Sequence, residues 1–379
     1  MALVQPQNVA PENGRSESLE AATALPDIAV VDVRSGGPLA HAALGHERMA
    51  VLRDACVSLL PGMATLAPVL DKVSSVWLGR TPSPYLAEIA AIAKLVRGGG
   101  VWFVNAAYEW GCTARVDDGP APVLWRALDF PFRGLGRHVE VALLDGGAGV
   151  YANVTWPGAV GVLTAVAPGR FAAAINQAPL FRRTRGLALL PCDIVLNAAA
   201  TWRLSGCWPA AHLLRHVFDT CASFEDAVAV LTEAPVARPT LYSIAGVLPS
   251  QACLIERNGT ESVVRRGSFT IANDWHPDGP KRDGSWMPRG SLARGPQDSE
   301  QRRRCLAGAG PGAPFAWLRD PVLNGFTRLA VEASAVSGEL RVQGFEPARR
   351  WWAEAVPATA VLDVVVDAGG GVRQTRAGG

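Results

Sequence analysis

Neither sign of charge dominates this sequence, which carries 36 lysines and arginines against 34 aspartates and glutamates and a net charge of +2. Such a chain has no global basic field to attract nucleic acid or an anionic membrane, so a dedicated nucleic-acid-binding protein is not expected. Charged residues are scarce at 18%, whereas hydrophobic residues make up 49%. This composition excludes a disordered polyelectrolyte and predicts that the 379 residues bury a substantial core.

Patterns typical of crosslinks, metal sites and membrane anchors are also missing. The seven cysteines form no Cys-x-x-Cys pair and are odd in number, which argues against a disulfide scaffold and a zinc cluster. No basic segment followed by an apolar one opens the chain, so we expect no secretory signal and a cytoplasmic location. Residues 146–169 are uncharged, but Asn153, Pro157 and Pro168 interrupt them, which favours two buried strands over stable membrane insertion.

The commonest cofactor and hydrolase signatures are absent: no G-x-G-x-x-G, Walker A, H-E-x-x-H or G-x-S-x-G stands in a usable context. His212 and His216 have the i, i+4 spacing of a metal pair, but no third ligand is evident, and a packed helix is the favoured interpretation. We therefore expect neither a cofactor nor a metal.

The order of the expected elements predicts an α+β protein. Apolar residues recur with helical spacing over residues 47–70 and 84–96, after a short strand near residue 30. Short Val-, Leu- and aromatic-rich runs over residues 123–179 predict an antiparallel meander, and helices return over 209–231, with Ser223 as a helix start. Further strands are expected over 240–246, 252–256 and 262–272, and a loop over 276–297. No βαβ alternation is visible, so a doubly wound sheet is not expected.

One stretch holds residues suited to chemistry: Gly111-Cys112-Thr113-Ala114-Arg115, followed by Trp125-Arg126-Ala127-Leu128-Asp129-Phe130. An unpaired cysteine is usually an inert core residue. Side chains three apart on a strand point to opposite faces, so Arg126 and Asp129 would share one site only at a bulge or a strand end. Spacing alone therefore favours a structural role for these residues.

The joint pattern nevertheless resembles the N-terminal-nucleophile (Ntn) cysteine amidases of the acid ceramidase, N-acylethanolamine acid amidase and choloylglycine (bile salt) hydrolase group. The similarity covers roughly residues 85–330 and includes, besides the stretch at Cys112, the segments Glu88-Ile89, 105–109, 156–179, 212–231, 240–246, 271–275 and 320–330. It implies an αββα four-layer sandwich. Residues 1–111 would be a helical, α-subunit- or propeptide-like region, and residues 112–379 the catalytic, β-subunit-like part of the same domain.

The resemblance gives each matching residue a role. Cys112 would be the nucleophile, freed as a chain start by attack on the Gly111 carbonyl, and its α-amine, with a reference pKa of roughly 7.7–8.0, would serve as general base. Arg126 would lie near the sulfur and favour thiolate, and Asp129 would hold the α-amine. Asn176 and Asn273 match the two asparagines placed around the oxyanion, and Arg302 matches a late arginine of the site.

Structural alternatives remain open for several of these residues. Asn273-Asp274 is also typical of a turn, and Asn176 of a strand-end cap. Arg302, Arg303 and Arg304 together also fit a solvated helix face, and the sequence does not decide which of them enters the site.

The implied function is an autoprocessed hydrolase that cleaves the linear amide bond of an N-acylated small molecule, of the N-acyl amide or ceramide-like lipid class, through an acyl-thioester on Cys112. Cleavage at Gly111–Cys112 would give an αβ heterodimer. An acyltransferase with the same nucleophile and a catalytically inactive binding protein are the alternatives. Two departures from the family pattern stand out: Ala114-Arg115 would bring an extra cation near the nucleophile, and the 28 residues between Asn273 and Arg302 predict a remodelled substrate rim.

Overall fold

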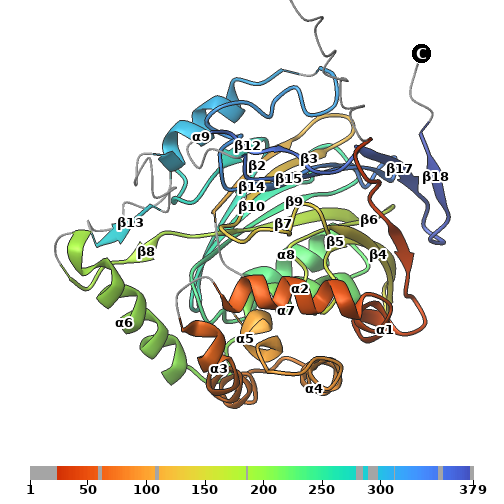
Figure 1. The fold of residues 1–379 in the computed structure, drawn as a ribbon. Helices are drawn as coiled ribbons and strands as arrows, with labels where there is room; N and C mark the ends of the chain where they lie inside the picture. Colours follow the sequence, from red (N-terminus) through yellow and green to blue (C-terminus); the bar gives the residue numbers. More distant parts are fainter. Residues whose placement is uncertain are drawn as a thin grey trace, which may run out of the picture.

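The computed structural model describes residues 24–58, 62–106, 111–184, 187–278, 285–288, 298–310, 312–348 and 353–375. In these residues two large β-sheets lie face to face, with helices on both outer sides (Figure 1). This arrangement confirms the α+β class and the αββα layering. The family-like residues 107–110 and most of the predicted loop over 276–297 lie outside the described residues.

The first sheet is antiparallel except at one edge, where β1 runs parallel to β4. Its strands, in spatial order, are β1 (Val30–Asp32), β4 (Glu140–Gly146), β5 (Gly149–Thr155), β6 (Thr164–Ala167), β7 (Phe171–Gln177), β9 (Thr240–Ala245), β10 (Ala252–Asn258) and β11 (Glu261–Arg266). The predicted meander is confirmed from β4 to β7.

The second sheet is antiparallel and contains the strand that starts at Gly111. Its strands, in spatial order, are β12 (Phe269–Ile271), β2 (Gly111–Asp117), β3 (Val123–Asp129), β14 (Thr327–Ala333), β15 (Glu339–Glu346), β17 (Leu362–Val366) and β18 (Val372–Gln374), and β16 (Val356–Pro357) also pairs with β15. A separate small sheet pairs β8 (Leu180–Phe181) with β13 (Trp286–Met287).

Two sequence predictions about these strands were wrong. The meander was expected to begin at β3, but β3 pairs with β2 and β14, because residues 130–139 carry the chain across to the first sheet. The single run over 262–272 is divided into β11 and β12, which lie in different sheets. Gly267, with φ of +97°, turns the chain between them, a conformation that glycine adopts without strain.

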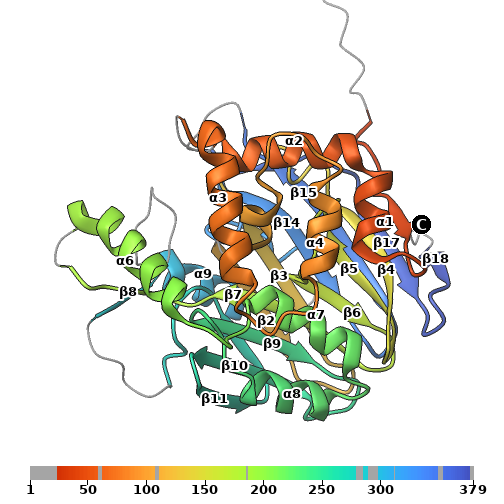
Figure 2. The same cartoon turned by 90° about the horizontal axis from the view of Figure 1, so that it is seen from below.

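Most helices form one layer on the outer face of the first sheet, and α9 lies on the outer face of the second (Figures 1 and 2). The layer on the first sheet comprises α1 (Gly37–Leu44), α2 (His46–Val57), α3 (Met63–Leu78), α4 (Leu86–Ala93), α5 (Val101–Ala106), α7 (Ala210–Thr220) and α8 (Phe224–Glu233). The predicted helices are present, and Ser223 caps α8 by accepting a hydrogen bond from the Asp226 amide. The sequence did not predict α6 (Leu190–Arg203). The three consecutive arginines lie on α9 (Asp298–Ala307). A 3-10 turn, Leu187–Leu189, precedes α6.

The core between the sheets determines which way β2 points its side chains. Cys112, Ala114 and Val116 alternate along β2 and are buried in that core, as the period of two in a strand requires. The intervening side chains face α9, where Arg115 reaches the Leu306 and Ala309 carbonyls. Arg115 is therefore on the opposite face from the sulfur, and the prediction of an extra cation near the nucleophile was wrong.

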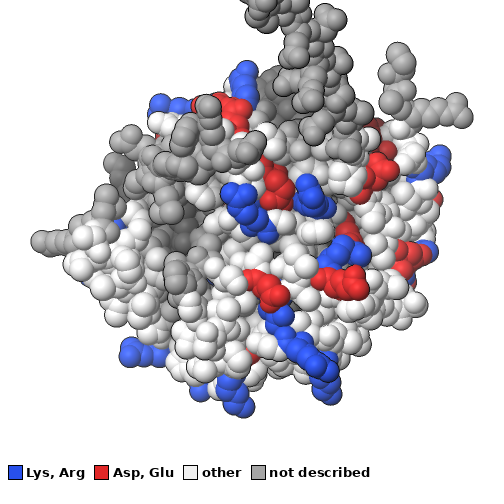
Figure 3. Space-filling view, in the orientation of Figure 1, with Lys and Arg blue, Asp and Glu red and all other residues white. Residues whose placement is uncertain are grey.

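Among the described residues, the charged side chains on one face of the molecule form no dominant patch of one sign (Figure 3). On the face shown in Figure 3, basic and acidic side chains are interspersed across its middle. Among the helices that the structure describes, none has both the length and the apolar character needed to cross a bilayer.

Candidate active site

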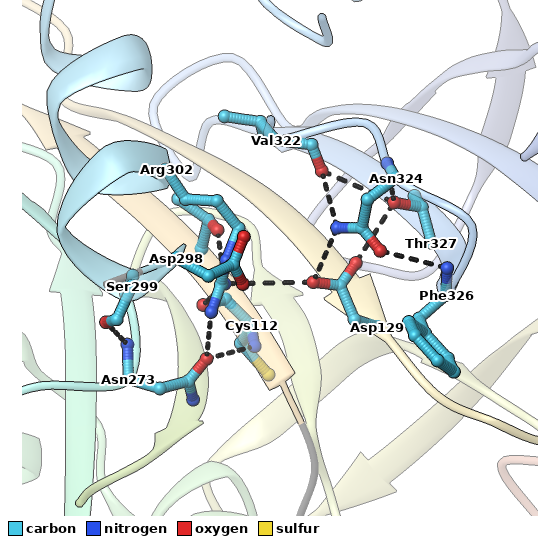
Figure 4. Close-up of polar contacts among 12 residues, drawn as sticks. Cys112, Asp129, Asn273, Asp298, Ser299, Arg302, Val322, Asn324, Phe326 and Thr327 are labelled. Atoms are coloured by element: carbon cyan, nitrogen blue, oxygen red, sulfur yellow. Dashed lines mark hydrogen bonds and ion pairs between the residues drawn. The ribbon is translucent and has the colours of Figure 1, made fainter. Parts of the chain in front are cut away.

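Cys112 is the second residue of β2, and three of its groups have partners on three different parts of the chain. Two of these partners, Asn273 and Arg302, are seen beside it in Figure 4. Its backbone N–H donates to Asn273 Oδ1 over 2.8 Å, and its carbonyl accepts a hydrogen bond from Arg302 Nη1 over 2.7 Å. Its sulfur lies on the other side of the strand and accepts a hydrogen bond from Arg126 Nη2 over 3.2 Å. Only 2% of the residue is exposed, so the position of the sulfur is tightly defined.

Arg126, on β3, spans the gap between the sheets. Its Nη2 also donates to the Ile175 carbonyl over 2.6 Å, and its Nη1 contacts the Leu163 carbonyl and Thr164 Oγ1. Its Nε finds no hydrogen-bond partner in the described part of the chain, although it is buried. The guanidinium is thus anchored to the first sheet while it contacts the sulfur on the second.

Opposing influences act on the Cys112 thiol. Burial is the largest and raises its pKa; the charge and hydrogen bond of Arg126 lower it, as does the charge of Arg302, and the nearby Asp129 raises it. The net effect is a raised pKa, because removing a thiolate from water is costly. Burial of Cys112 thus favours the neutral thiol, and Arg126 and Arg302 oppose this effect.

Asp129, the last residue of β3, approaches Cys112 from the opposite face. It stands directly across the ladder from Gly111, and its carboxylate lies 3.7 Å from Arg302 Nη1. Burial raises the pKa of Asp129, against lowering by Arg302 and by two neutral donors, Asn324 and Thr327. Arg126 and Asp129 therefore point to opposite faces, as their spacing predicts, and flank Cys112 from its two sides.

Asn176 and Asn273 meet where β7 and β12 end, and each side chain bonds to the backbone beside the other. Asn176 Nδ2 donates to the Ala272 carbonyl over 3.0 Å, and Asn273 Nδ2 donates to the Gln177 carbonyl over 2.8 Å. These bonds join the two sheets, so neither the local turn nor the local cap explains the pair. An amide carries two N–H donors, and each of these bonds uses one of them. The buried Asn176 Oδ1 has no partner among the described residues.

Arg302 is the arginine of α9 that enters the site. It is 1% exposed, and its Nε donates to Asp298 Oδ2, its Nη1 to Thr113 Oγ1 and its Nη2 to Asn273 Oδ1, at 2.8 to 2.9 Å. Arg303 and Arg304 pair with Glu300 near the surface instead. The alternative of a solvated helix face is therefore correct for Arg303 and Arg304 and wrong for Arg302.

Sequence reasoning missed the residues that support this arrangement. Asp298, one turn before Arg302, binds the guanidinium of Arg302. Ser299 Oγ accepts a hydrogen bond from the backbone N–H of Asn273 over 2.8 Å. The i, i+4 spacing of Asp298 and Arg302 was a usable signal. Asn324 and Thr327 lie in a segment quoted only for its resemblance, and nothing in their spacing indicates that they contact Asp129.

The two histidines considered as metal ligands have packing partners. His212 Nδ1 lies 2.9 Å from Ser83 Oγ, and burial, with the charge of Arg215, lowers the pKa of His212 to about 3. The His216 ring stacks on Trp208 with 4.9 Å between centroids. Over the described residues, no group of three or more His, Cys, Asp or Glu side chains is placed to hold a metal ion.

Solved structures to which the chain is similar include a Caenorhabditis elegans ortholog of the N-acylethanolamine-hydrolyzing acid amidase, at 17% identity and a TM-score of 0.44, over 59% of this chain and 93% of that one. They also include the C2A mutant of the conjugated bile acid hydrolase of Clostridium perfringens, at 8% identity, a TM-score of 0.39 and coverage of 66% and 96%. A third is the penicillin V acylase of Agrobacterium tumefaciens, at 12% identity, a TM-score of 0.33 and coverage of 70% and 98%.

No protein-family model and no curated protein matches the chain in sequence. At the identities and TM-scores of these structures, any function has to be argued from the geometry around Cys112.

Proposed function

We propose that the protein is an Ntn cysteine amidase that frees Cys112 by cleaving its own chain and then hydrolyses the linear amide bond of an N-acylated small molecule. One observation carries the proposal: the sulfur, amide nitrogen and carbonyl of a single cysteine are held by Arg126, Asn273 and Arg302 from three separate elements. A structural cysteine needs none of these partners. Burial raises the thiol pKa of Cys253, which is fully buried on β10, as it does that of Cys112. Within the residues that the structure describes, however, only the Cys112 sulfur of these two accepts a hydrogen bond from an arginine side chain.

Self-cleavage requires the Cys112 sulfur to attack the Gly111 carbonyl carbon. A C–S bond forms, the Gly111–Cys112 C–N bond breaks, and the amide nitrogen takes up the thiol proton to become an amine. Water then hydrolyses the thioester, giving a Gly111 carboxylate and a free thiol. Glycine suits this position because a Cβ there would lie 3.2 Å from Asp129 Cβ.

The new α-amine would then act on the thiol as its general base. It takes the thiol proton, the thiolate attacks the acyl carbon of the substrate, and the negative charge moves to the acyl oxygen. The N–H groups of Asn176 and Asn273 not used between the sheets are the candidate donors to that oxyanion. Collapse of the intermediate passes the proton to the leaving amine, and water hydrolyses the acyl-thioester to release the acid.

An aromatic cluster, two of whose members follow the two asparagines closely along the chain, supports an apolar acyl group. Trp286 on β13 lies 5.0 Å from Phe181 on β8 and 5.3 Å from Trp275, measured between ring centroids. Phe181 follows Asn176 closely along the chain, and Trp275 follows Asn273. Trp286 belongs to the segment between Asn273 and α9, so aromatic side chains that contact one another follow both proposed oxyanion donors along the chain, which favours a fatty or aromatic acyl chain.

Contacts across the proposed cut support an αβ heterodimer as the product. β1 pairs with β4, Tyr85 donates to Asp219 Oδ2 over 2.7 Å, and Glu88 pairs with Arg215. Each pair joins a residue before position 111 to one after it. These partly buried polar contacts would keep the two pieces together after cleavage.

Intact-mass analysis under denaturing conditions tests the proposal, with Cys112→Ala as the test variant and Cys253→Ala as a matched buried-cysteine control. We expect wild type and Cys253→Ala to give fragments of residues 1–111 and 112–379, and Cys112→Ala to stay whole. The cleaved proteins should release nitroaniline from lauroyl or phenylacetyl p-nitroanilide. An uncut wild type that still hydrolyses these probes would contradict the free-amine mechanism, and an uncut, inactive one would indicate the inactive binding protein.

Adding hydroxylamine as a competing amine separates hydrolysis from acyl transfer. A hydrolase gives mainly the free acid at millimolar amine, whereas an acyltransferase gives mainly the hydroxamate.

A further inference from the structure

The turn that precedes β14 closes over the Asp129 carboxylate and gives each of its oxygens a neutral donor (Figure 4). Thr327 Oγ1 donates to Oδ1 over 3.0 Å, and Asn324 Nδ2 donates to Oδ2 over 3.1 Å. Both donors are buried: Asn324 is 6% exposed and Thr327 is inaccessible to solvent. Two anchors on two different oxygens fix the plane of the carboxylate as well as its position.

The turn is itself held by internal hydrogen bonds that direct these donors. The Asn324 N–H donates to Thr327 Oγ1 over 3.0 Å, and Asn324 Oδ1 accepts from the Phe326 N–H over 2.9 Å. With its oxygen accepting, the threonine hydroxyl points its proton outward, where Asp129 Oδ1 is closer than the Val322 carbonyl at 3.3 Å. A hydrogen bond to an ionised acceptor is also the stronger choice.

An irregularity in the sheet places Thr327 where it is needed. The register between β3 and β14 shifts between Thr327 and Leu329, which leaves Thr327 paired with Asp129. Asp129 is at the same time the partner of Gly111 on its other side. The carboxylate is therefore fixed between this turn and the backbone that the proposed reaction cuts.

We propose that Asn324 and Thr327 are positioning residues that orient the Asp129 carboxylate toward the Cys112 nitrogen and keep it ionised there. The inference rests on the proposed function, because the group that Asp129 would hold is the α-amine created by cleavage. An amine that is to serve as a base needs a carboxylate partner in one orientation, and a protonated Asp129 would not supply it.

The charged and titratable groups facing Asp129 come from three elements: Arg302 and Asp298 on α9, Cys112 on β2 and Arg328 on β14. Burial raises the pKa of Asp129, and Asp298 raises it further, whereas Arg302, Asn324 and Thr327 lower it. Removing one neutral donor to a carboxylate should therefore move the titration of Asp129 upward, by about one pH unit.

Thr327→Val tests the inference, because it keeps the shape of the side chain and removes the hydroxyl. Thr327→Ser keeps the hydroxyl and is the rescue variant, and Asn324→Ala tests the other donor. Thr359→Val is the matched control: Thr359 is also buried, and its hydroxyl accepts from the Gly344 amide over 2.9 Å. The first readout is the Asp129 carboxyl ¹³C titration in ¹³C-aspartate-labelled Cys112→Ala protein, assigned by comparison with Asp129→Asn. This readout does not require activity.

We expect the Asp129 titration to move up by about one unit in Thr327→Val and in Asn324→Ala, and to stay in place in Thr327→Ser and Thr359→Val. In the cleaved enzymes, the acid limb of the kcat/KM profile should move in the same direction. An unchanged titration in both Thr327→Val and Asn324→Ala would overturn the inference while leaving the amidase proposal standing. If the titrations shift but the wild-type protein neither cleaves itself nor hydrolyses the anilides, Asn324 and Thr327 do hold the Asp129 carboxylate. Its catalytic purpose is then overturned together with the proposed function.

Discussion

Arg126 donates a hydrogen bond to the Cys112 sulfur over 3.2 Å while its guanidinium also binds the Leu163 and Ile175 carbonyls across the gap between the sheets. The charge of Arg126 and this hydrogen bond both lower the pKa of the Cys112 thiol, whereas burial raises it. The thiol pKa should therefore be higher in Arg126→Gln than in wild type. We expect kcat/KM of the cleaved enzyme to fall about ten- to a hundredfold, since such a bond contributes about 1.5–3 kcal/mol. The alkaline shift of its pH profile is the diagnostic measurement.

Arg257→Gln is the control for this experiment. Arg257 is also fully buried, and its guanidinium binds the Leu231, Gly259 and Glu261 carbonyls rather than the site. It should lower thermal stability without moving the pH profile. A pH profile that moves equally in both variants would mean that Arg126 acts only through the fold.

Asn273→Ala should reduce kcat by about 10²–10³, with a much smaller change in KM, because an oxyanion donor acts mainly in the transition state. Steady-state kinetics on chains shown by mass to be fully cleaved would measure this. Asn153→Ala removes an equally buried amide, from β5 of the first sheet, that makes no hydrogen bond to Cys112, Asn176 or Asn273 in the described structure, and should retain kcat. A loss confined to KM in Asn273→Ala would assign this residue to ground-state binding.

Gly111→Ala should slow self-cleavage about tenfold. The added Cβ would lie 3.2 Å from Asp129 Cβ and 3.4 Å from its Oδ2, so the carboxylate or the scissile bond must move by a few tenths of an ångström. The time course of fragment appearance after purification measures the rate. Gly119→Ala, where a Cβ meets no atom within 4 Å, should cleave at the wild-type rate.

Arg302→Leu should destabilise the fold by about 3–5 kcal/mol at neutral pH, because it leaves Asp298 and Asp129 buried without their cation. Loss of Arg302 raises the pKa of Asp129 further. A buried acid with a raised pKa contributes stability at low pH that is lost as the pH rises through that pKa. The deficit should therefore shrink from pH 7 toward pH 4 in urea unfolding.

The neighbouring Arg303→Leu removes a partly exposed pair with Glu300 and should cost at most about 1 kcal/mol at either pH. Equal deficits in the two variants would contradict the distinct placement of Arg302.

Much of this architecture was predictable because its signals are local. Apolar residues alternate along β4 to β7 and recur with helical spacing in α7 and α8. Both patterns indicate which face of the element is buried, and they can be seen in a short stretch of sequence. The pairing of β3 with β14 was not predictable in this way, because about two hundred residues separate them and no short turn sets their register.

The candidate site likewise contains residues that the sequence predicted and residues that it did not. The resemblance predicted Cys112, Arg126, Asp129, Asn176, Asn273 and Arg302. The structure places Arg126, Asn273 and Arg302 in contact with Cys112, Asp129 in contact with Arg302, and Asn176 in contact with the backbone next to Asn273. It did not identify Ser299, Asn324 or Thr327, whose contribution is a single hydrogen bond at a long sequence separation. Hydroxyl and amide side chains of this kind occur throughout the chain, so only the folded geometry distinguishes these three.

The pairing of β1 with β4 has a consequence for how residues 112–379 would be made if the proposed cleavage occurs. β4 is the edge that the first sheet would present without β1, and an unpaired strand edge is a template for aggregation. Residues 112–379 synthesised from their own start codon would expose that edge. Under the proposed cleavage, we therefore expect residues 112–379 to fold only when they are translated as one polypeptide with the first segment, which acts as their folding partner.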